Sequence, residues 1–409
     1  MTEAWIIDGT RSPRGKGKAN GSLHAIHPQE LLAQVLNALA DRTGIDTNDV
    51  DDVIIGNGNS AGDHGACIGR MSVLAAGWPV GAPGITLNRF CGSGQQAITF
   101  AAMGIQAGHQ QLVVGGGVES MSRWPVDNAP PDFTAGNAKL RDAFPLVPQG
   151  ISADLIATIE GFSRDDVDAF AVESQARTAK AMAEGAFDRS VVPILAPDGS
   201  VALDVDEFPR PGSTLEAMAK LQASFARMGS RVFEGYDKSF DAMCADVYPG
   251  IDHVDHVHHA GNSSGVVDGA SAVLLASPDY ARAHGLQPRA RIVMSAVAGA
   301  EPVIMLTAPG PASKKCLERA AMTVDDIDLW EINEAFAAVP LKTIRDLGLD
   351  PHKVNVNGGA IALGHPIGAT GGMLIQTALD ELERRDLSTA LITMCTGGGM
   401  GTATIIERV

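Results

Sequence analysis

The chain has 409 residues, of which 45% are hydrophobic and 5% aromatic, and it contains 46 glycines. This composition is typical of a soluble α/β protein with tight turns, and the length suffices for two or three core-forming units. The formal net charge of −17 argues against nucleic acids and anionic membranes as main partners.

The five cysteines are widely spaced and form no CxxC pair, which indicates a reducing compartment without structural disulfides. The N-terminal segment lacks the basic and apolar regions of a signal peptide. No stretch reaches the roughly 20 apolar residues that a membrane span needs. We therefore expect a cytoplasmic protein that does not cross a membrane.

The first 120 residues alternate short apolar runs with helix-like segments. Residues 28–43 have helical periodicity, with leucines and a valine on one face. Strands are expected at 4–8, 53–57, 85–88 and 112–118. Such alternation predicts an α/β fold with a mostly parallel sheet covered by helices on both faces.

Residues 121–250 interrupt this alternation. Prolines break the first part, and helices are then expected at 152–159 and at 164–184, where Ser163 provides a start signal. The region therefore reads as an inserted loop domain. Its later part carries basic residues that could meet a phosphorylated ligand or stay solvated, namely Arg210, Lys220, Arg227, Arg231 and Lys238.

After about residue 250 the α/β pattern returns and repeats the first half. Segments 50–57, 85–88 and 112–117 have counterparts at 324–333, 354–357 and 391–399. We therefore predict two similar α/β halves packed together. The predicted division is 1–120 completed by about 251–278 for the first half, 121–250 for the insertion and 279–409 for the second half.

Cys91 lies at the junction between an apolar run, residues 84–88, and a helix-compatible stretch that continues to residue 107. A thiol at a helix N-terminus feels the positive end of the helix dipole, which favours the thiolate. The adjacent glycines would leave N–H groups free to bind an anion. Taken alone, Cys91 could equally be a buried small apolar residue, which is the commoner role of a free cysteine.

The repeat supplies partners for Cys91 from the second half. His365 stands in a glycine-rich turn before an amphipathic helix, Cys395 ends the last core strand, and Asn333 follows another strand. Because these reactive and polar groups stand at corresponding strand ends, we expect them to converge with Cys91 between the two halves.

Four motifs follow one another in a fixed order: Asn88–Gly94 around Cys91, Asn333–Ala337, Gly364–Pro366 and Cys395–Gly399. They resemble the motifs of the thiolase family, and the match runs from the first strand to the last. The resemblance implies a thiolase fold, in which two similar βαβαβαββ halves form α/β/α/β/α layers with an inserted loop domain. It also implies homodimers or homotetramers and coenzyme A thioester chemistry.

The resemblance also implies the roles of individual residues. Cys91 is the nucleophile, His365 takes its proton, and Cys395 protonates the acetyl-CoA enolate. An Asn333-held water with His365 forms one oxyanion hole, and the N–H groups of Cys91 and Gly397 form the other. Residues beside coenzyme A are Ser264, Met305 and Phe336, whereas the Arg or Lys contacts to its phosphates are not assigned. Coenzyme A is a substrate, and no metal or other bound cofactor is expected.

The substrate preference is inferred from two further segments. Biosynthetic thiolases typically carry a histidine where this chain has Pro148. Segments 147–157 and 256–262 resemble thiolase subunits of bacterial fatty-acid β-oxidation complexes. We therefore expect a 3-ketoacyl-CoA thiolase (acetyl-CoA C-acyltransferase) of β-oxidation, for which a hydratase/dehydrogenase subunit is a candidate partner.

Three alternatives remain open from the sequence. The first is a biosynthetic acetyl-CoA C-acetyltransferase, and the second is a condensing enzyme of the ketoacyl synthase type, against which Cys395 argues. The third is a non-catalytic acyl-CoA-binding subunit. Separately, the run Asp252–His259 offers metal-ligand types, but we expect no functional metal because side chains in an extended run would diverge.

Overall fold

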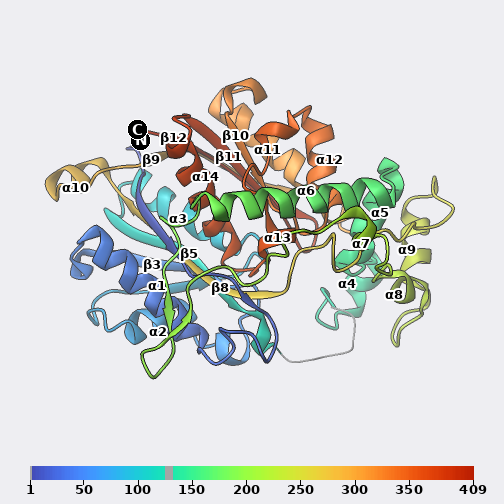
Figure 1. Ribbon diagram of the computed structural model, residues 1–409, viewed down its shortest axis with the longest axis horizontal. Coiled ribbons are helices and arrows are strands. Elements are labelled where there is room, and N and C mark those ends of the chain that lie inside the picture. The colour runs from blue at the N-terminus through green and yellow to red at the C-terminus, as the bar shows by residue number, and fades with distance from the viewer. Residues whose placement is uncertain (1, 125–131) are drawn as a thin grey trace.

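A ten-stranded sheet runs through the molecule in the order β10-β11-β12-β9-β1-β8-β5-β3-β4, with β2 paired to β8 (Figure 1). The computed structural model describes residues 2–124 and 132–409. Met1 and the 125–131 part of the predicted insertion lie outside the described residues. The strands of this sheet are β1 Trp5–Arg11, β2 Gly15–Lys16, β3 Asp52–Gly56, β4 Ile85–Leu87, β5 Leu112–Ser120, β8 Val267–Ala276, β9 Ala290–Gly299, β10 Leu329–Ile332, β11 Thr389–Thr396 and β12 Met400–Arg408.

The sheet consists of two similar halves that meet at β1 and β9. These strands pair only through Trp5 with Arg291 and Ile6 with Ala290. In the first half β3 pairs with β5 in parallel and β5 with β8 antiparallel, and in the second half β10, β11 and β12 repeat this pattern. The repeat that the sequence predicts is therefore confirmed.

Two details of the predicted sheet are wrong. Most of its pairings are antiparallel, and β11 and β12, for example, are joined by a tight turn at Gly398 and Gly399, which only antiparallel neighbours permit. The counterpart of β4 is also not a strand. Asn355 adopts a left-handed φ of 46°, and its side chain exchanges two 2.8 Å hydrogen bonds with the Ile332 backbone in place of a ladder.

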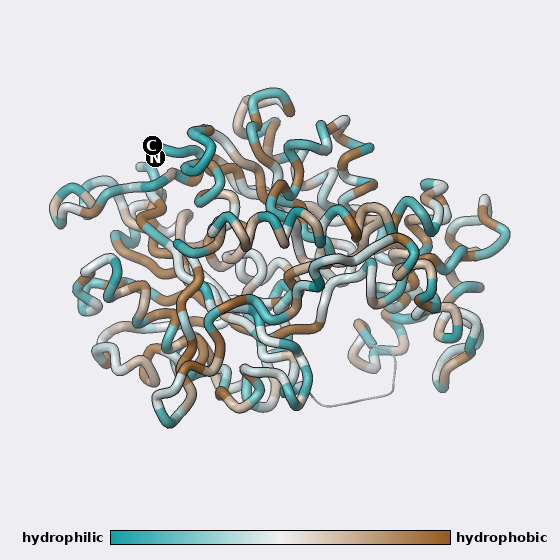
Figure 2. Tube along the Cα trace, in the orientation of Figure 1, coloured by the Kyte–Doolittle hydropathy of each residue, from teal (hydrophilic) through white to brown (hydrophobic). Residues whose placement is uncertain are grey.

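Helices cover the sheet in layers. On the outer faces lie α1 (Pro28–Thr43) and α2 (Ile68–Ala75) in the first half and α11 (Pro309–Ala320) and α12 (Ala338–Leu347) in the second. Between the halves, α3 (Ser93–Gln106) and α14 (Thr370–Arg384) contact each other and strands of the sheet. The predicted α/β/α/β/α layering is confirmed. Figure 2 shows hydrophobic segments through the sheet region and hydrophilic ones at the outer loops.

The two central helices approach closely because glycines line their contact. A Cβ at Gly371 of α14 would lie 2.2 Å from the backbone nitrogen of Gln95, and one at Gly94 would lie 2.5 Å from the Gly368 oxygen. Any side chain at these positions would separate the two N-termini. The glycines around Cys91 and after His365 therefore place the starts of both central helices against each other.

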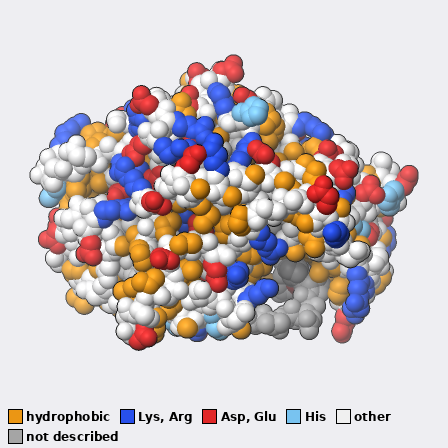
Figure 3. All heavy atoms as spheres, viewed as in Figure 1, with side chains coloured by type: hydrophobic (Ala, Val, Ile, Leu, Met, Phe, Trp, Pro, Cys, Tyr) orange, Lys and Arg blue, Asp and Glu red, His pale blue; other side chains and the backbone are white. Residues whose placement is uncertain are grey.

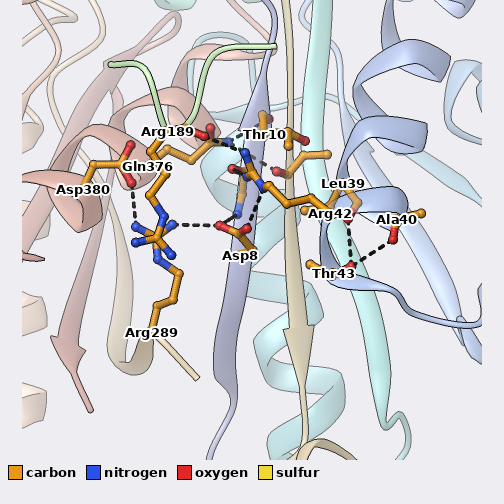
Figure 4. A network of polar contacts seen from close by, with 12 residues as sticks. Asp8, Thr10, Leu39, Ala40, Arg42, Thr43, Arg189, Arg289, Gln376 and Asp380 are labelled. Atoms are coloured by element: carbon orange, nitrogen blue, oxygen red, sulfur yellow. Dashed lines mark hydrogen bonds and ion pairs between the residues drawn. The ribbon is translucent and has the colours of Figure 1, made fainter. Parts of the chain in front are cut away.

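A buried arginine ties the halves together beside the β1–β9 junction (Figure 4). Arg289, which precedes β9, donates to Asp8 on β1 at 2.8 Å and to Asp380 on α14 at 2.6 Å. Arg42 on α1 reaches the second oxygen of Asp8 at 2.7 Å. The network connects the outer helix of one half, the central helix and the sheet.

The segment between β5 and β8 forms most of the right-hand part of the molecule in Figure 1, and α6 crosses over the sheet. The two helices predicted in it are present as α5 and α6, and Ser163 caps α6 as expected. Its elements are α4 Ala138–Ala143, α5 Gln149–Glu160, α6 Arg164–Ala183, β6 Ile194–Leu195, β7 Val201–Leu203, α7 Leu215–Met218, α8 Ala226–Ser230 and α9 Phe240–Val247. The second half also contains α10 Pro278–Ala283, which precedes β9, and α13 Ala360–Leu363.

Charged side chains of both signs are interspersed on the face shown in Figure 3, among hydrophobic and uncharged polar side chains. Over residues 2–124 and 132–409, none of the helices combines the length and the apolar character that a membrane crossing requires.

Candidate active site

Cys91 sits in a strained turn between β4 and α3. Phe90 has a left-handed φ of 48°, which is unusual for an aromatic residue. The turn is held by Asn88, whose Oδ1 accepts from the Phe90 N–H at 2.7 Å, and by Ser93, whose hydroxyl donates to the Phe90 carbonyl at 2.6 Å. The motif around Cys91 thus builds a rigid elbow that presents the sulfur at the start of α3.

The Cys91 sulfur is buried, with 4% of the residue exposed. Burial raises the pKa of the thiol to about 11, against the opposing effect of hydrogen bonds from the Gln149 side chain and the Gly397 N–H. The expectation that the helix N-terminus favours a thiolate is therefore wrong for the ligand-free protein, because desolvation outweighs the dipole. Cys91 is a thiol at neutral pH and needs a base.

Cys395 lies at the end of β11, beside Cys91. Burial raises its pKa, and the proximity of Cys91 raises it further. Its sulfur is completely buried in an apolar cluster that also contains Met305. A thiol in this environment keeps its proton, so Cys395 can act as an acid toward a carbanion formed next to Cys91.

His365 lies in the loop between α13 and α14. Its Nδ1 is 2.6 Å from the Thr370 hydroxyl, which is also 3.2 Å from the Pro366 carbonyl. Since the hydroxyl donates to that carbonyl, the imidazole carries its proton on Nδ1 and leaves Nε2 free as a base. Burial, aided by the nearby Arg14 guanidinium, lowers the pKa of His365 to about 3, so the ring is neutral at physiological pH.

Asn333 directly follows β10 and faces His365. Its Nδ2 lies 3.4 Å from Nε2 of His365, and its Oδ1 is buried without a hydrogen-bond partner among the described residues. The next residue, Glu334, fixes this position by accepting from Ser174 at 2.7 Å and from Asn355 at 2.9 Å. Asn333 is thus held with an acceptor that a water molecule could occupy.

Glu119 connects the His365 loop to the first half. One carboxylate oxygen accepts from the Gly58 N–H at 2.7 Å and from the Gly368 N–H at 3.0 Å, and the residue is fully buried. Burial raises the pKa of Glu119 to about 7 despite these hydrogen bonds. Because Gly368 also contacts Gly94 of α3, the carboxylate locks the His365 loop against the start of the Cys91 helix.

The three residues expected beside coenzyme A lie near this centre. Met305 belongs to the apolar cluster that contains Cys395, and the partly buried Phe336 packs against it. Phe336 contacts the rings of Phe225 and His258 edge-on, at centroid distances of 5.9 and 5.7 Å. The half-buried Ser264 donates its N–H to the Ala335 carbonyl at 2.9 Å, so its segment runs alongside the motif that contains Asn333.

A cavity of roughly 230 Å³ opens next to that segment. Ala260 and Gly261 line one side, and Arg210 lines another with its guanidinium over the Phe208 ring, 5.2 Å from the ring centroid. Of the basic residues in the insertion, Arg210 is therefore the one that lines a cavity beside the expected coenzyme A segment. Lys238, by contrast, pairs with Asp246 at the surface.

The histidine run Asp252–His259 is bound by carboxylates of the insertion. His256 and His258 both hydrogen-bond Asp154, at 2.7 and 2.8 Å, so the expected divergence is wrong for this pair because residues two apart share a side of an extended chain. His259 instead bonds Asp168 at 2.8 Å. In the part of the chain that the structure describes, no His, Cys, Asp or Glu cluster has a metal-binding arrangement.

The structure therefore brings Cys91, Cys395 and the Gly397 N–H together at one sulfur, with Asn333 and His365 paired beside them. Sequence reasoning missed Gln149, Thr370 and Glu119. Thr370 could have been found as a hydroxyl at the helix start five residues after His365. Gln149 comes from the insertion, and no sequence pattern relates it to Cys91.

Two family models together match most of the chain. "Thiolase, N-terminal domain" matches residues 4–232, and "Thiolase, C-terminal domain" matches residues 286–408. A β-ketoadipyl-CoA thiolase of Acinetobacter baylyi is 42% identical, with full coverage of both chains. A steroid 3-ketoacyl-CoA thiolase of Mycobacterium tuberculosis is 40% identical, with 100% of this chain and 95% of the relative covered.

A solved structure gives the same result for the fold. The crystal structure of the Bacillus anthracis acetyl-CoA acetyltransferase superposes with a TM-score of 0.84 at 36% identity, covering 100% of this chain and 99% of that one. The chain belongs to the thiolase family and has the thiolase fold. As a thiolase, it is an acyltransferase that acts on acyl-CoA.

Proposed function

We propose that the protein is a 3-ketoacyl-CoA thiolase of the degradative type, which cleaves 3-ketoacyl-CoA with coenzyme A to acetyl-CoA and a shortened acyl-CoA. One observation carries this proposal. A buried Cys91 sulfur receives the Gly397 N–H and lies beside a second buried thiol, Cys395. A nucleophile with its own backbone donor and a neighbouring proton source is what carbon–carbon cleavage next to a thioester requires.

In the first step, Cys91 attacks the 3-keto carbon while His365 takes the thiol proton on Nε2. The charge moves from sulfur to the carbonyl oxygen, where the N–H groups of Cys91 and Gly397 stabilise it. Collapse of this intermediate forms the acyl-thioester on Cys91 and breaks the C2–C3 bond. The released electron pair forms the acetyl-CoA enolate, which takes its proton from Cys395.

In the second step, the Cys395 thiolate accepts the proton of an incoming coenzyme A thiol. The coenzyme A sulfur then attacks the acyl-thioester, and Cys91 leaves as a thiolate that recovers its proton from His365. Asn333, through a water on its free Oδ1, and His365 Nε2 are proposed to stabilise the thioester oxygen of the enolate. The chain's own residues and coenzyme A carry every step, so no bound cofactor is proposed.

The proposed seat of coenzyme A extends from the site to the surface of the insertion. Its pantetheine arm would pass Ser264, Met305 and Phe336, and Arg210 beside Ala260 is the proposed phosphate contact. The arginine is positioned for this role because its guanidinium lies over Phe208 at the cavity wall. A guanidinium is well suited to a phosphate because it offers several N–H donors in a fixed fork.

The place of the enzyme in fatty-acid β-oxidation remains our proposal, and relatives named for several 3-ketoacyl-CoA substrates support a degradative role. We further propose a homodimer or homotetramer in the cytoplasm, with a hydratase/dehydrogenase subunit as a candidate partner. Strand β4 ends the sheet, and Ile85 on it is 48% exposed, which leaves an apolar edge available for a second copy. All five cysteines are free, as a reducing compartment requires.

The decisive experiment combines acyl-enzyme detection with substrate profiling. We expect substrate to add an acyl group to Cys91, seen by mass spectrometry, and Cys91→Ser to abolish it, whereas the exposed Cys67→Ser leaves it unchanged. Near-normal turnover of Cys91→Ser would refute the mechanism. Activity on acetoacetyl-CoA alone, without 3-ketodecanoyl-CoA, would establish the biosynthetic alternative, and absence of any acyl-enzyme would indicate a non-catalytic subunit.

A further inference from the structure

Gln149 begins α5 in the insertion, yet its side chain hydrogen-bonds the Cys91 sulfur in the first half of the fold. We infer that Gln149 is a further catalytic residue, which donates a carboxamide N–H to Cys91 and stabilises its thiolate during attack. This inference rests on the proposed role of Cys91 as nucleophile.

The first turn of α5 is fixed, so the carboxamide is held at this place. The Ser152 hydroxyl donates to the Val303 carbonyl at 2.7 Å, which ties the turn to the segment that contains Met305. A Cβ at Gly150 would lie 2.3 Å from the Phe225 ring, so the helix backbone rests directly on that ring. Phe225 in turn packs edge-on against Phe336. The start of α5 is therefore anchored from two sides.

The insertion also closes the opposite side of the sulfur. Phe133 packs edge-on against Phe90, with ring centroids 5.7 Å apart, and a Cβ at Gly397 would lie 2.8 Å from its ring. The sulfur is thus shielded from solvent and has few donors. In such a site each hydrogen bond to a developing anion matters more than it would in water.

The chemistry of the sulfur favours a donor at this position. Cys91 is desolvated, and the Gly397 N–H is the other neighbour that donates to its sulfur from outside its own residue. A carboxamide supplies an N–H without a charge, so it stabilises the thiolate without holding the thiol permanently ionised. Gln149 and Gly397 would then share the anion until the charge passes to the carbonyl oxygen and the proton rests on His365.

Alkylation of Cys91 by iodoacetamide, followed by peptide mass spectrometry, tests this inference without any substrate. Loss of a hydrogen bond to a charged group lowers the thiolate fraction about ten- to a hundredfold, and the higher nucleophilicity of a more basic thiolate offsets part of this. We expect Gln149→Met to slow alkylation of Cys91 roughly three- to tenfold at pH 8. A merely structural role predicts the opposite, since a loosened α5 would expose the sulfur and speed alkylation.

Two further variants complete the test. Gln34→Met removes a carboxamide that bonds Leu195 on the outer side of the first half, and it should leave Cys91 alkylation unchanged. Gln149→Glu keeps the size of the side chain but offers no N–H when ionised, so its alkylation rate relative to the parent should rise as the pH is lowered and the carboxyl gains a proton. This variant decides the case if Gln149→Met does not fold.

Unchanged or faster Cys91 alkylation in Gln149→Met, or a pH-independent ratio for Gln149→Glu, would overturn the inference. Neither result depends on acyl-enzyme formation, which tests the proposed function separately. A slowed alkylation in an enzyme that forms no acyl-Cys91 would support the hydrogen bond and refute the nucleophile.

Discussion

Asn333 Nδ2 lies 3.4 Å from Nε2 of His365, although the two residues are 32 positions apart and one ends a strand while the other precedes a helix. Thr370 holds Nδ1 of the same ring, so Nε2 is the free nitrogen and Asn333 marks where it acts. Asn333 also keeps a buried oxygen without a partner among the described residues. The pair therefore defines a place for a water molecule and a developing oxyanion.

We predict that Asn333→Ala lowers kcat of thiolysis about a hundred- to a thousandfold, the effect of removing one oxyanion-hole donor. KM should change little, because the contact forms mainly in the transition state. Steady-state kinetics with thermal unfolding in parallel provide the check. An increase in KM at constant kcat would show instead that Asn333 only binds substrate.

A second prediction concerns the buried thiol of Cys395. Its raised pKa keeps it protonated beside Cys91, so it can exchange a proton with the methyl group of acetyl-CoA. Cys395→Ala should abolish incorporation of deuterium into acetyl-CoA in heavy water, while Cys91 is still acetylated. NMR and mass spectrometry measure the two events on one sample.

The matched control is Cys316, another buried cysteine, which packs in the outer core of the second half. Cys316→Ala should retain deuterium exchange. If Cys395→Ala also retains it, a different group provides the proton and the proposed division of roles between the two cysteines is wrong.

The catalytic residues could be predicted because the chain repeats its fold. Asn333 and Cys395 follow strands that correspond to strands of the first half, so their convergence on Cys91 follows from the repeat itself. The ionisation of Cys91 could not be predicted. It depends on how deeply the sulfur is buried, and burial is set by Phe133 and other residues from the insertion that no local pattern connects to the site.

The same reasoning explains the other errors. The antiparallel pairings arise from the turns and the return of the chain after the insertion, whereas the sequence signals only the alternation of strands and helices. Asn355 replaces a predicted strand by side-chain hydrogen bonds, which a short apolar run does not reveal. Long-range contacts decided each of these features.

A third prediction concerns the junction between the halves. Arg289 is 6% exposed and bonds Asp8 and Asp380, so Arg289→Met leaves two buried carboxylates without their partner. Breaking a buried ion pair in this way costs about 3–5 kcal/mol of unfolding free energy. Lys238→Met, which removes an exposed pair with Asp246, should cost less than about 1 kcal/mol. Urea unfolding of both variants measures the difference, and equal small losses would contradict the role of Arg289.

The last prediction uses His256, which lies between Asp154 and Asp241 at 2.7 and 3.2 Å. Burial opposes its charged form, but the hydrogen bonds to the two carboxylates outweigh this and raise its pKa to about 9 from an ordinary 6.5. A raised folded-state pKa means that the folded protein binds the proton more tightly than the unfolded chain. The resulting stabilisation is fully present below pH 6.5 and is lost as the pH rises through about 9.

His256→Gln should therefore destabilise the protein most at about pH 6, and the difference from the parent should shrink as the pH approaches 9. Urea unfolding at several pH values between these limits gives the curve for each protein. His253→Gln is the control, because His253 pairs with Asp255 at the surface, where both side chains are more than half exposed. A constant difference across this range would mean that His256 contributes by packing alone, since only a proton held more tightly in the folded state makes the loss depend on pH.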